Sequence, residues 1–207
     1  MKSAHITSLS RLAITLALAQ ALSACTKTEA PGPSASQSAQ TTPAASSSPD
    51  QAYAAAGTQG KGFSVGAVMS AHTVYVLFDP QCPHCGHLWE AAKPLQSKAK
   101  FVWIPVSIMN SKSGPQGAAL LQAGNPAEVM SAHEKSILAG TGGMAASASA
   151  PAEIEQAIKS NTALFNSLKA NSVPYIIAKH SQTGQVITNA GAMDTAGLTK
   201  FLGFSAL

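Results

Sequence analysis

Two cysteines in the segment Cys82-Pro83-His84-Cys85 directly follow a run of apolar residues. The run spans residues 73–78 and consists of β-branched, aromatic and aliphatic side chains, which is typical of a strand buried on both faces of an α/β sheet. Asp79-Pro80-Gln81 ends this strand, and residues 82–92 have helical composition. The pattern therefore predicts a cysteine pair at the start of a helix that follows a central strand.

Apolar runs elsewhere in the chain predict further strands. Residues 63–69 indicate a weaker edge strand, and residues 100–108 indicate a second buried strand in which Pro105 favours an edge position or a bulge. Residues 174–178 and 185–188 flank a turn-forming Ser-Gln-Thr-Gly sequence and predict a β-hairpin. The chain therefore combines buried strands with a hairpin near its C-terminus.

Helical patterns lie mainly between the second buried strand and the hairpin. They cover residues 116–122, 126–138 and 151–169. Asp194 is expected to cap a last helix. The order strand, helix, strand, helical block, hairpin and helix is that of an α/β, thioredoxin-like fold with a helical insertion at about residues 114–170, between the second strand and the hairpin. We expect this domain to span residues 63–207.

The first 24 residues have the features of a secretory signal, because two basic residues accompany an apolar stretch at residues 12–19 that is too short for a membrane span. The sequence Leu22-Ser23-Ala24-Cys25 that follows resembles the lipobox of bacterial lipoproteins, which would make Cys25 the acylated first residue of the exported protein. Ordinary secretion with an incidental cysteine is the alternative. Thr26 favours the outer membrane if the source is a Gram-negative bacterium.

Residues 25–62 are rich in Ser, Ala, Thr, Gln, Pro and Gly and contain almost no large apolar side chain. Such a segment cannot bury enough surface to offset the conformational entropy that it loses on ordering. We therefore expect the lipidated Cys25 to be followed by a disordered tether, which would hold a folded domain near a membrane surface.

The charge balance excludes one class of partner. Without Lys2 and Arg11 of the predicted signal, the 13 basic residues fall to 11, against 9 acidic residues. No Lys/Arg cluster and no interleaved aromatic stripe accompany this near-neutral balance. We therefore expect no nucleic-acid partner.

Cysteine usage indicates redox chemistry. Lipidation of Cys25 would leave Cys82 and Cys85 as the only other cysteines, so a structural disulfide framework cannot form. At the start of a helix, unpaired N–H groups and the helix dipole would stabilise the sulfur of Cys82 as a thiolate. Pro83 and His84 lie between the cysteines, and His84 would add partial positive charge. Cys85, one turn further along, is expected to be the buried resolving thiol, and this chemistry needs no cofactor.

Val173-Pro174 lies directly before the first strand of the hairpin and is predicted to form the second part of the site. In this fold a cis proline at that place packs against the disulfide and leaves the backbone of the preceding residue free to pair with an extended substrate. An ordinary trans proline at a strand start is the alternative. We expect Val173 and Pro174 to contact the substrate, and the sequence leaves the isomer of Pro174 open.

Residues 74–202 resemble the catalytic domain of the DsbC and DsbG family of bacterial periplasmic disulfide isomerases. The similarity is strongest at residues 74–85 and extends to Leu88-Trp89, Lys93-Pro94 and the strand that follows Pro174. The resemblance implies a periplasmic thiol-disulfide oxidoreductase. It also implies substrates among thiol- or disulfide-containing envelope proteins, and a membrane redox partner.

Three differences from that family change the expectation. The predicted tether replaces the N-terminal dimerisation domain of the family, which favours a monomer. Val173 stands where these isomerases usually carry Thr, and Pro83-His84 is the pair that the oxidising DsbA proteins carry. Val76 occupies the position at which thioredoxin and DsbA keep a buried acid, and Asp79 would replace that acid only if it folded back toward Cys85. The direction of electron flow therefore stays open between an oxidase and a reductase or isomerase.

Two other functions are compatible with the sequence. A lipoprotein could keep the fold as a non-catalytic binding protein or chaperone, which would not depend on its cysteine pair. Soft ligands from Cys82, His84, Cys85 and His87 could instead bind Zn or Cu(I) for delivery, although a structural zinc site usually needs a further ligand pair. The remaining histidines of the predicted domain show no matching motif and are expected at the surface. These are His72, His133 and His180.

Overall fold

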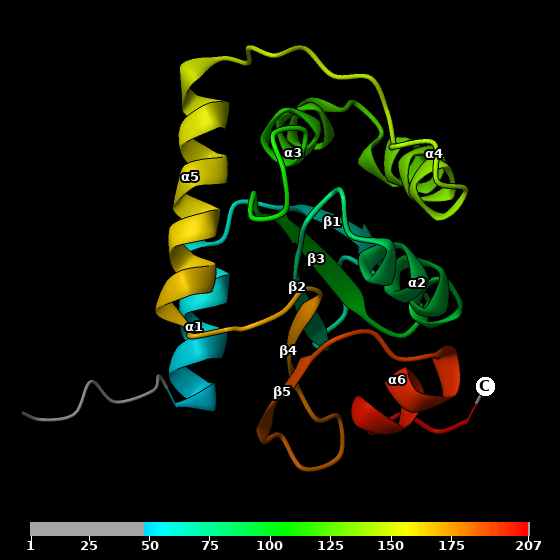
Figure 1. The fold of residues 1–207 in the computed structure, drawn as a ribbon. Helices are drawn as coiled ribbons and strands as arrows, with labels where there is room; N and C mark the ends of the chain where they lie inside the picture. Colours follow the sequence, from blue (N-terminus) through cyan, green and yellow to red (C-terminus); the bar gives the residue numbers. More distant parts are fainter. Residues whose placement is uncertain (1–47, 207) are drawn as a thin grey trace, which may run out of the picture. The chain divides into compact units, whose positions relative to one another are not determined.

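A five-stranded mixed sheet forms the centre of the part of the chain that the computed structural model describes, residues 48–206 (Figure 1). The strands are β1 (Phe63–Gly66), β2 (Thr73–Phe78), β3 (Lys100–Pro105), β4 (Tyr175–Lys179) and β5 (Val186–Ala190). Their order across the sheet is β1-β3-β2-β4-β5, and only β2 and β3 are parallel to each other. The predicted signal sequence, Cys25 and the first part of the predicted tether lie outside the described residues.

Six α-helices and one short 3₁₀ turn surround this sheet. They are α1 (Pro49–Gln59), α2 (Pro83–Ala92), the 3₁₀ turn η1 (Lys93–Leu95), α3 (Ser113–Gln122), α4 (Pro126–Leu138), α5 (Ala152–Ser167) and α6 (Thr195–Phe201). Helices α1 and α5 pack together on one side of the sheet, α2 and α6 pack together on the other, and α4 covers α2 (Figure 1). Within residues 48–206, no helix has the length and apolar character needed to cross a membrane.

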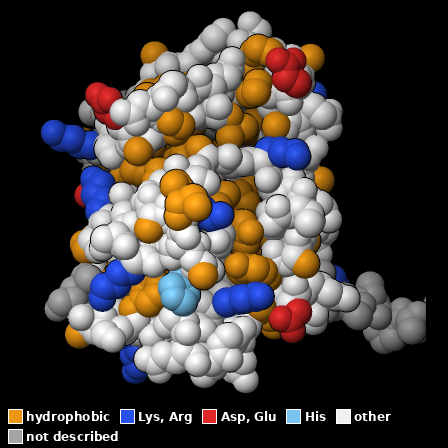
Figure 2. All heavy atoms as spheres, turned by 180° about the vertical axis from the view of Figure 1, so that it is seen from behind, with side chains coloured by type: hydrophobic (Ala, Val, Ile, Leu, Met, Phe, Trp, Pro, Cys, Tyr) orange, Lys and Arg blue, Asp and Glu red, His pale blue; other side chains and the backbone are white. Residues whose placement is uncertain are grey.

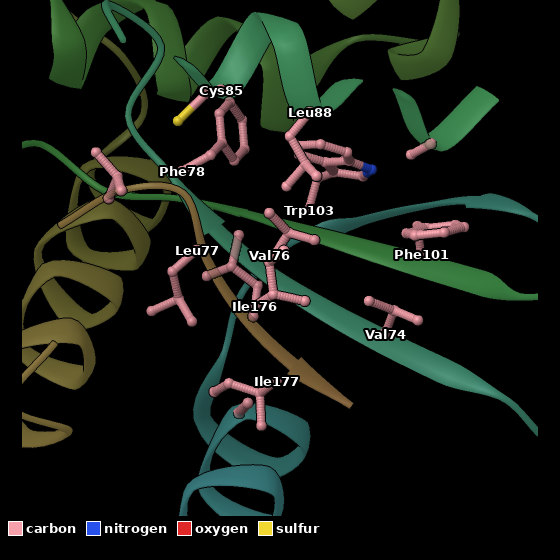
Figure 3. Close-up of a cluster of buried hydrophobic side chains, with 14 of the residues drawn as sticks. Val74, Val76, Leu77, Phe78, Cys85, Leu88, Phe101, Trp103, Ile176 and Ile177 are labelled. Carbon is pink, nitrogen blue, oxygen red and sulfur yellow. The ribbon is translucent and has the colours of Figure 1, made fainter. Parts of the chain in front are cut away.

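The main core lies between the sheet and α2, where the predicted strand at residues 73–78, now β2, meets the helix that carries the cysteines. Figure 3 shows side chains of β2, β3 and α2 directed into this layer, among them Phe78, Leu88 and Trp103. The ring of Trp103 packs edge-on against Phe78 at 5.5 Å and against Trp89 at 5.1 Å between ring centroids. Because such pairs add packing energy beyond the buried area, they hold the helix that carries the cysteines firmly on the central strands.

The prediction for Pro105 was wrong, because β3 lies inside the sheet rather than at its edge. Pro105 is the last residue of β3 and pairs with Phe78 of the parallel strand β2. On the other side of β3, the antiparallel ladder with β1 ends at Trp103. A proline without an N–H is tolerated here because it stands beyond that second ladder.

The predicted tether was also wrong over its last part, because residues 49–59 form helix α1. Ser48 starts this helix with a capping box, in which its hydroxyl accepts the N–H of Gln51 and the side chain of Gln51 accepts the N–H of Ser48. Ala52 and Ala56 are buried against the sheet, and Tyr53 packs edge-on against Tyr75 of β2.

Small apolar residues explain why composition alone missed helix α1. A helix that lies close to a sheet can bury alanines instead of large side chains, so a segment rich in Ala and Ser can still pack. After the helix, Asn161 of α5 accepts the N–H of Lys61 and donates to its carbonyl, which fixes the chain before β1. The folded domain therefore includes helix α1 and does not begin at residue 63.

On the face of residues 48–206 that Figure 2 shows, Lys side chains are scattered among apolar and uncharged groups instead of forming a continuous basic patch. This distribution agrees with the near-neutral charge of the chain once the predicted signal is set aside.

Helix α1 should contribute measurably to stability. Ala56→Asp places an unpaired charge on its buried face and is expected to lower the free energy of unfolding by roughly 3 kcal/mol. Ala54→Asp, on the exposed side of the same helix, should change it by no more than about 0.5 kcal/mol. Urea unfolding of both variants checks this difference, and equal, small effects would show that α1 does not pack on the sheet.

Candidate active site

The cysteine pair lies at the junction between the central strand β2 and helix α2. Cys82 is the N-cap residue of α2 and Pro83 occupies its first turn, where a missing N–H costs nothing. The side chain of Cys82 makes no capping hydrogen bond, and its sulfur lies at the N-terminus of the helix, where the helix dipole favours negative charge. Both cysteines are free thiols in this structure, Cys82 being 4% exposed and Cys85 fully buried.

The two thiols differ strongly in acidity. A hydrogen bond from Cys85 lowers the pKa of Cys82 to about 6, against the opposing effect of burial, and the backbone N–H groups of Cys85 and His84 and the charge of His84 act in the same direction. Burial raises the pKa of Cys85 well above its ordinary value, and its hydrogen bond to Cys82 raises it further. Cys82 is therefore suited to be the attacking thiolate and Cys85 the resolving thiol.

Val173 and Pro174 lie against this pair, as the sequence analysis expected. The Val173-Pro174 peptide bond is cis, which resolves the alternative that the sequence left open. The sulfur of Cys82 lies 3.6 Å from the carbonyl oxygen of Val173. When Cys82 is a thiol, its S–H can donate a weak hydrogen bond to that oxygen. The two predicted parts of the site, far apart in sequence, thus meet at one sulfur.

Asp79 stabilises the turn between β2 and α2 and does not fold back as a free acid. Its carboxylate is fully buried and accepts hydrogen bonds from the backbone N–H groups of Gln81 at 2.9 Å, Ile108 at 2.8 Å and Met109 at 3.0 Å. These contacts fix the residues before Cys82 and the segment after β3 relative to each other.

His133 is buried, so the prediction that it lies at the surface was wrong. Its Nδ1 accepts the N–H of Met144 at 3.1 Å, so Nε2 carries the proton and donates to the carbonyl of Pro80 at 2.7 Å. Burial lowers the pKa of His133 and keeps the ring neutral at neutral pH. This histidine connects helix α4 and the glycine-rich loop after it to the turn that precedes Cys82.

The other histidines are distributed around the domain. His84 and His87 are exposed on α2, with 6.4 Å between their ring centroids. His72 and His180 are only half-exposed, contrary to expectation, and the ring of His72 packs against Phe204. Within residues 48–206, no three side chains of His, Cys, Asp or Glu come together as a metal-binding group.

A glutamate that the sequence analysis did not consider also lies at the site. Glu134 of α4 is fully buried, and neither of its carboxylate oxygens has a hydrogen-bond partner among the described residues. Burial raises the pKa of Glu134 to about 9, with further contributions from the charges of Cys82, Asp79 and Glu90. Helical spacing from the apolar residue Met130 places position 134 on the inward face of α4, which is the sequence signal that could have identified it.

The contact between α4 and α2 brings Glu134 close to the cysteine pair. A methyl group added at Gly86, the residue after Cys85, would lie 2.8 Å from Oε2 of Glu134. The absence of a side chain at Gly86 therefore makes room for the carboxyl group at the first turn of α2.

Comparison with known proteins gives relatives of one kind. No known family model matches the sequence. The thiol:disulfide interchange protein DsbG of Pseudomonas aeruginosa is 29% identical over 140 residues, which cover 67% of this chain and 54% of that protein. DsbG of Escherichia coli is 28% identical over 118 residues, which cover 55% of this chain and 47% of that protein. The chain thus spans about half the length of the curated relatives that it matches.

Solved structures show the same fold. The catalytic domain of Proteus mirabilis ScsC has a TM-score of 0.54 at 14% identity, over 73% of this chain and 95% of that one. A thioredoxin-like oxidoreductase from Silicibacter pomeroyi has a TM-score of 0.54 at 18% identity, over 69% of this chain and 90% of that one. The fold and the cysteine pair define a thioredoxin-fold protein with a Cys-x-x-Cys centre, which confirms the predicted fold class. By sequence, the chain is similar to the DsbG thiol:disulfide interchange proteins.

The hydrogen bond from Cys85 can be tested through the acidity of Cys82. Cys85→Ala removes the donor and should raise the pKa of Cys82 from about 6 toward the ordinary value of about 8.5, whereas Cys85→Ser keeps an O–H donor and should raise it less. Ultraviolet absorbance of the thiolate during a pH titration measures each value. Identical pKa values in the wild type and Cys85→Ala would show that this hydrogen bond does not stabilise the thiolate.

Proposed function

We propose that this chain is a cell-envelope thiol-disulfide oxidoreductase that donates the Cys82–Cys85 disulfide to exported proteins. The acidity of Cys82 is the observation that supports this direction most. A low pKa stabilises the reduced pair with its thiolate, and a pair whose reduced form is stabilised is a stronger oxidant. The similarity to the DsbG proteins supports the disulfide exchange itself.

In the donor reaction, a substrate thiolate attacks Sγ of Cys82 in the disulfide. The Cys82–Cys85 bond breaks, a mixed disulfide joins the substrate to Cys82, and Cys85 leaves with the electron pair. A second substrate thiolate then attacks the substrate sulfur, and Cys82 leaves as a thiolate. The substrate has lost two electrons and two protons in forming its disulfide. The cysteine pair has gained both electrons and one proton, at Cys85, and the other proton goes to the solvent.

Access to Cys82 indicates where the substrate binds. Only 4% of Cys82 is exposed, and the carbonyl of Val173 lies beside its sulfur, so a substrate sulfur approaches past the Val173-Pro174 loop. An extended substrate segment would pair with the backbone of that loop. Ile108 and Met109, which are 42% and 50% exposed, supply apolar side chains beside the turn that Asp79 holds.

The location of this activity is proposed from the N-terminal sequence. Residues 1–24 have the pattern of a secretory signal, and Cys25 follows a lipobox-like sequence. We place the mature protein in the periplasm as a lipid-anchored monomer, in the outer membrane if the source is Gram-negative. A membrane redox partner would reoxidise the cysteine pair after each donation.

The direct test is equilibration with glutathione, followed by assays with protein substrates. A Cys25→Ser form leaves Cys82 and Cys85 as the only thiols. It is expected to have a reduction potential above roughly −200 mV and to form disulfides in a reduced, unfolded substrate protein. Cys82→Ser and Cys85→Ser should abolish that turnover.

Other outcomes would separate the alternatives. A potential near that of thioredoxin, about −270 mV, would support a reductase instead of a donor. The non-catalytic chaperone would be supported by two results together. The cysteine variants would still bind envelope proteins, and the protein with both cysteines would show no disulfide exchange.

A further inference from the structure

Glu134 is a buried acid that the proposed exchange reaction does not yet use. An unpaired carboxyl group in a protein interior costs free energy, and such groups are rare outside functional sites. Its neighbourhood is unusual as well, since Gly86 lacks the side chain that would otherwise collide with Oε2. The burial of Glu134 without partners, and its place against the first turn of α2, call for a functional reason.

We infer that Glu134 exchanges the proton that Cys85 must gain when the disulfide opens and lose when it closes. The inference rests on the proposed function and names the group that manages the second thiol. In this role Glu134 is a general acid and base for the reacting sulfur of Cys85, and it does not touch the substrate. Val76 cannot hold a proton, and Asp79, the conditional candidate from the sequence, already accepts three backbone N–H groups, so Glu134 is left to act as the buried acid.

The proton balance follows the two directions of the reaction. When a substrate thiolate opens the disulfide, Cys85 leaves as a buried thiolate, and neutral Glu134 gives it a proton directly or through one bridging water. When the disulfide closes, the Cys85 thiol passes its proton to the Glu134 carboxylate. The new Cys85 thiolate then attacks Sγ of Cys82 and the substrate sulfur leaves with the electron pair. Glu134 exchanges its own proton with solvent between turnovers.

The charges around Glu134 match this sequence of events. Burial is the largest cause of the raised pKa of Glu134. The negative charges of Cys82, of Asp79 in the preceding turn and of Glu90 in α2 raise this pKa further. When Cys82 is joined to a substrate, its negative charge is gone and one of these contributions is lost. The pKa of Glu134 then falls, so the acid becomes a better acceptor at the stage when Cys85 has to lose its proton.

Glu134→Gln tests this role because it keeps the shape and neutrality of the protonated acid but cannot transfer the proton. The reduced Cys25→Ser protein is mixed with the aryl disulfide dithiobis(nitrobenzoate), and the two released thiolates are followed by their absorbance. The first phase reports attack by Cys82, and the second reports attack by Cys85 on the mixed disulfide. Glu134→Gln should slow the second phase by ~10-fold or more at neutral pH and leave the first unchanged.

The pH profile separates proton transfer from a structural effect. In the wild type, the plot of the second-phase rate constant against pH should change slope at the pKa of Glu134. In Glu134→Gln, this rate constant should rise in proportion to hydroxide concentration, without a bend in the plot. Glu134→Asp keeps a carboxyl group, so its plot should again show a bend, with second-phase rate constants below those of the wild type. Glu128→Gln, an exposed substitution on the same helix, is the matched control and should leave both phases as they are.

An unchanged rate and an unchanged bend in Glu134→Gln, with the fold intact by circular dichroism, would overturn the inference while the proposed exchange reaction stands. A wild type that releases only one thiolate would overturn the proposed function, and the inference with it.

Discussion

One hydrogen bond organises the chemistry of this protein: the thiol of Cys85 donates to the sulfur of Cys82 at the start of α2. The bond makes the two cysteines unequal, because it favours the anion on Cys82 and keeps the proton on the buried Cys85. A pair of equal, exposed thiols would have neither a ready nucleophile nor a protected second thiol. The rest of the domain can be understood as the means of keeping these two sulfurs in place.

Several layers of the fold contribute to that placement. The edge-on packing of Trp103 with Phe78 and Trp89 fixes α2 on the central strands. Polar contacts then hold the turn before Cys82, with Asp79 binding backbone N–H groups from two segments and His133 binding the carbonyl of Pro80. The helical insertion is therefore more than a cover for α2, since it supplies both His133 and Glu134 to the site.

Local sequence patterns were sufficient for the parts of the structure whose stability is mainly local. The central strand at residues 73–78 and the helix at residues 126–138 have the predicted bounds, because apolar runs and caps determine them. Features that depend on tertiary packing were missed. Helix α1 buries alanines that look like linker composition, and His133 and Glu134 become buried only when α4 packs on α2 and on the turn before Cys82. The cis form of Pro174 likewise depends on surroundings that a single sequence does not show.

The pH dependence of the reduction potential tests the central hydrogen bond most directly. Reduction takes up two electrons, together with two protons when Cys82 is a thiol and one proton when it is a thiolate. The potential should therefore fall by roughly 60 mV per pH unit at low pH and by roughly 30 mV above the pKa of Cys82, since a tenfold change corresponds to about 30 mV for two electrons. We predict the break at a pH of about 6. A slope that stays near 60 mV up to about pH 8.5, as for two ordinary thiols, would contradict the account.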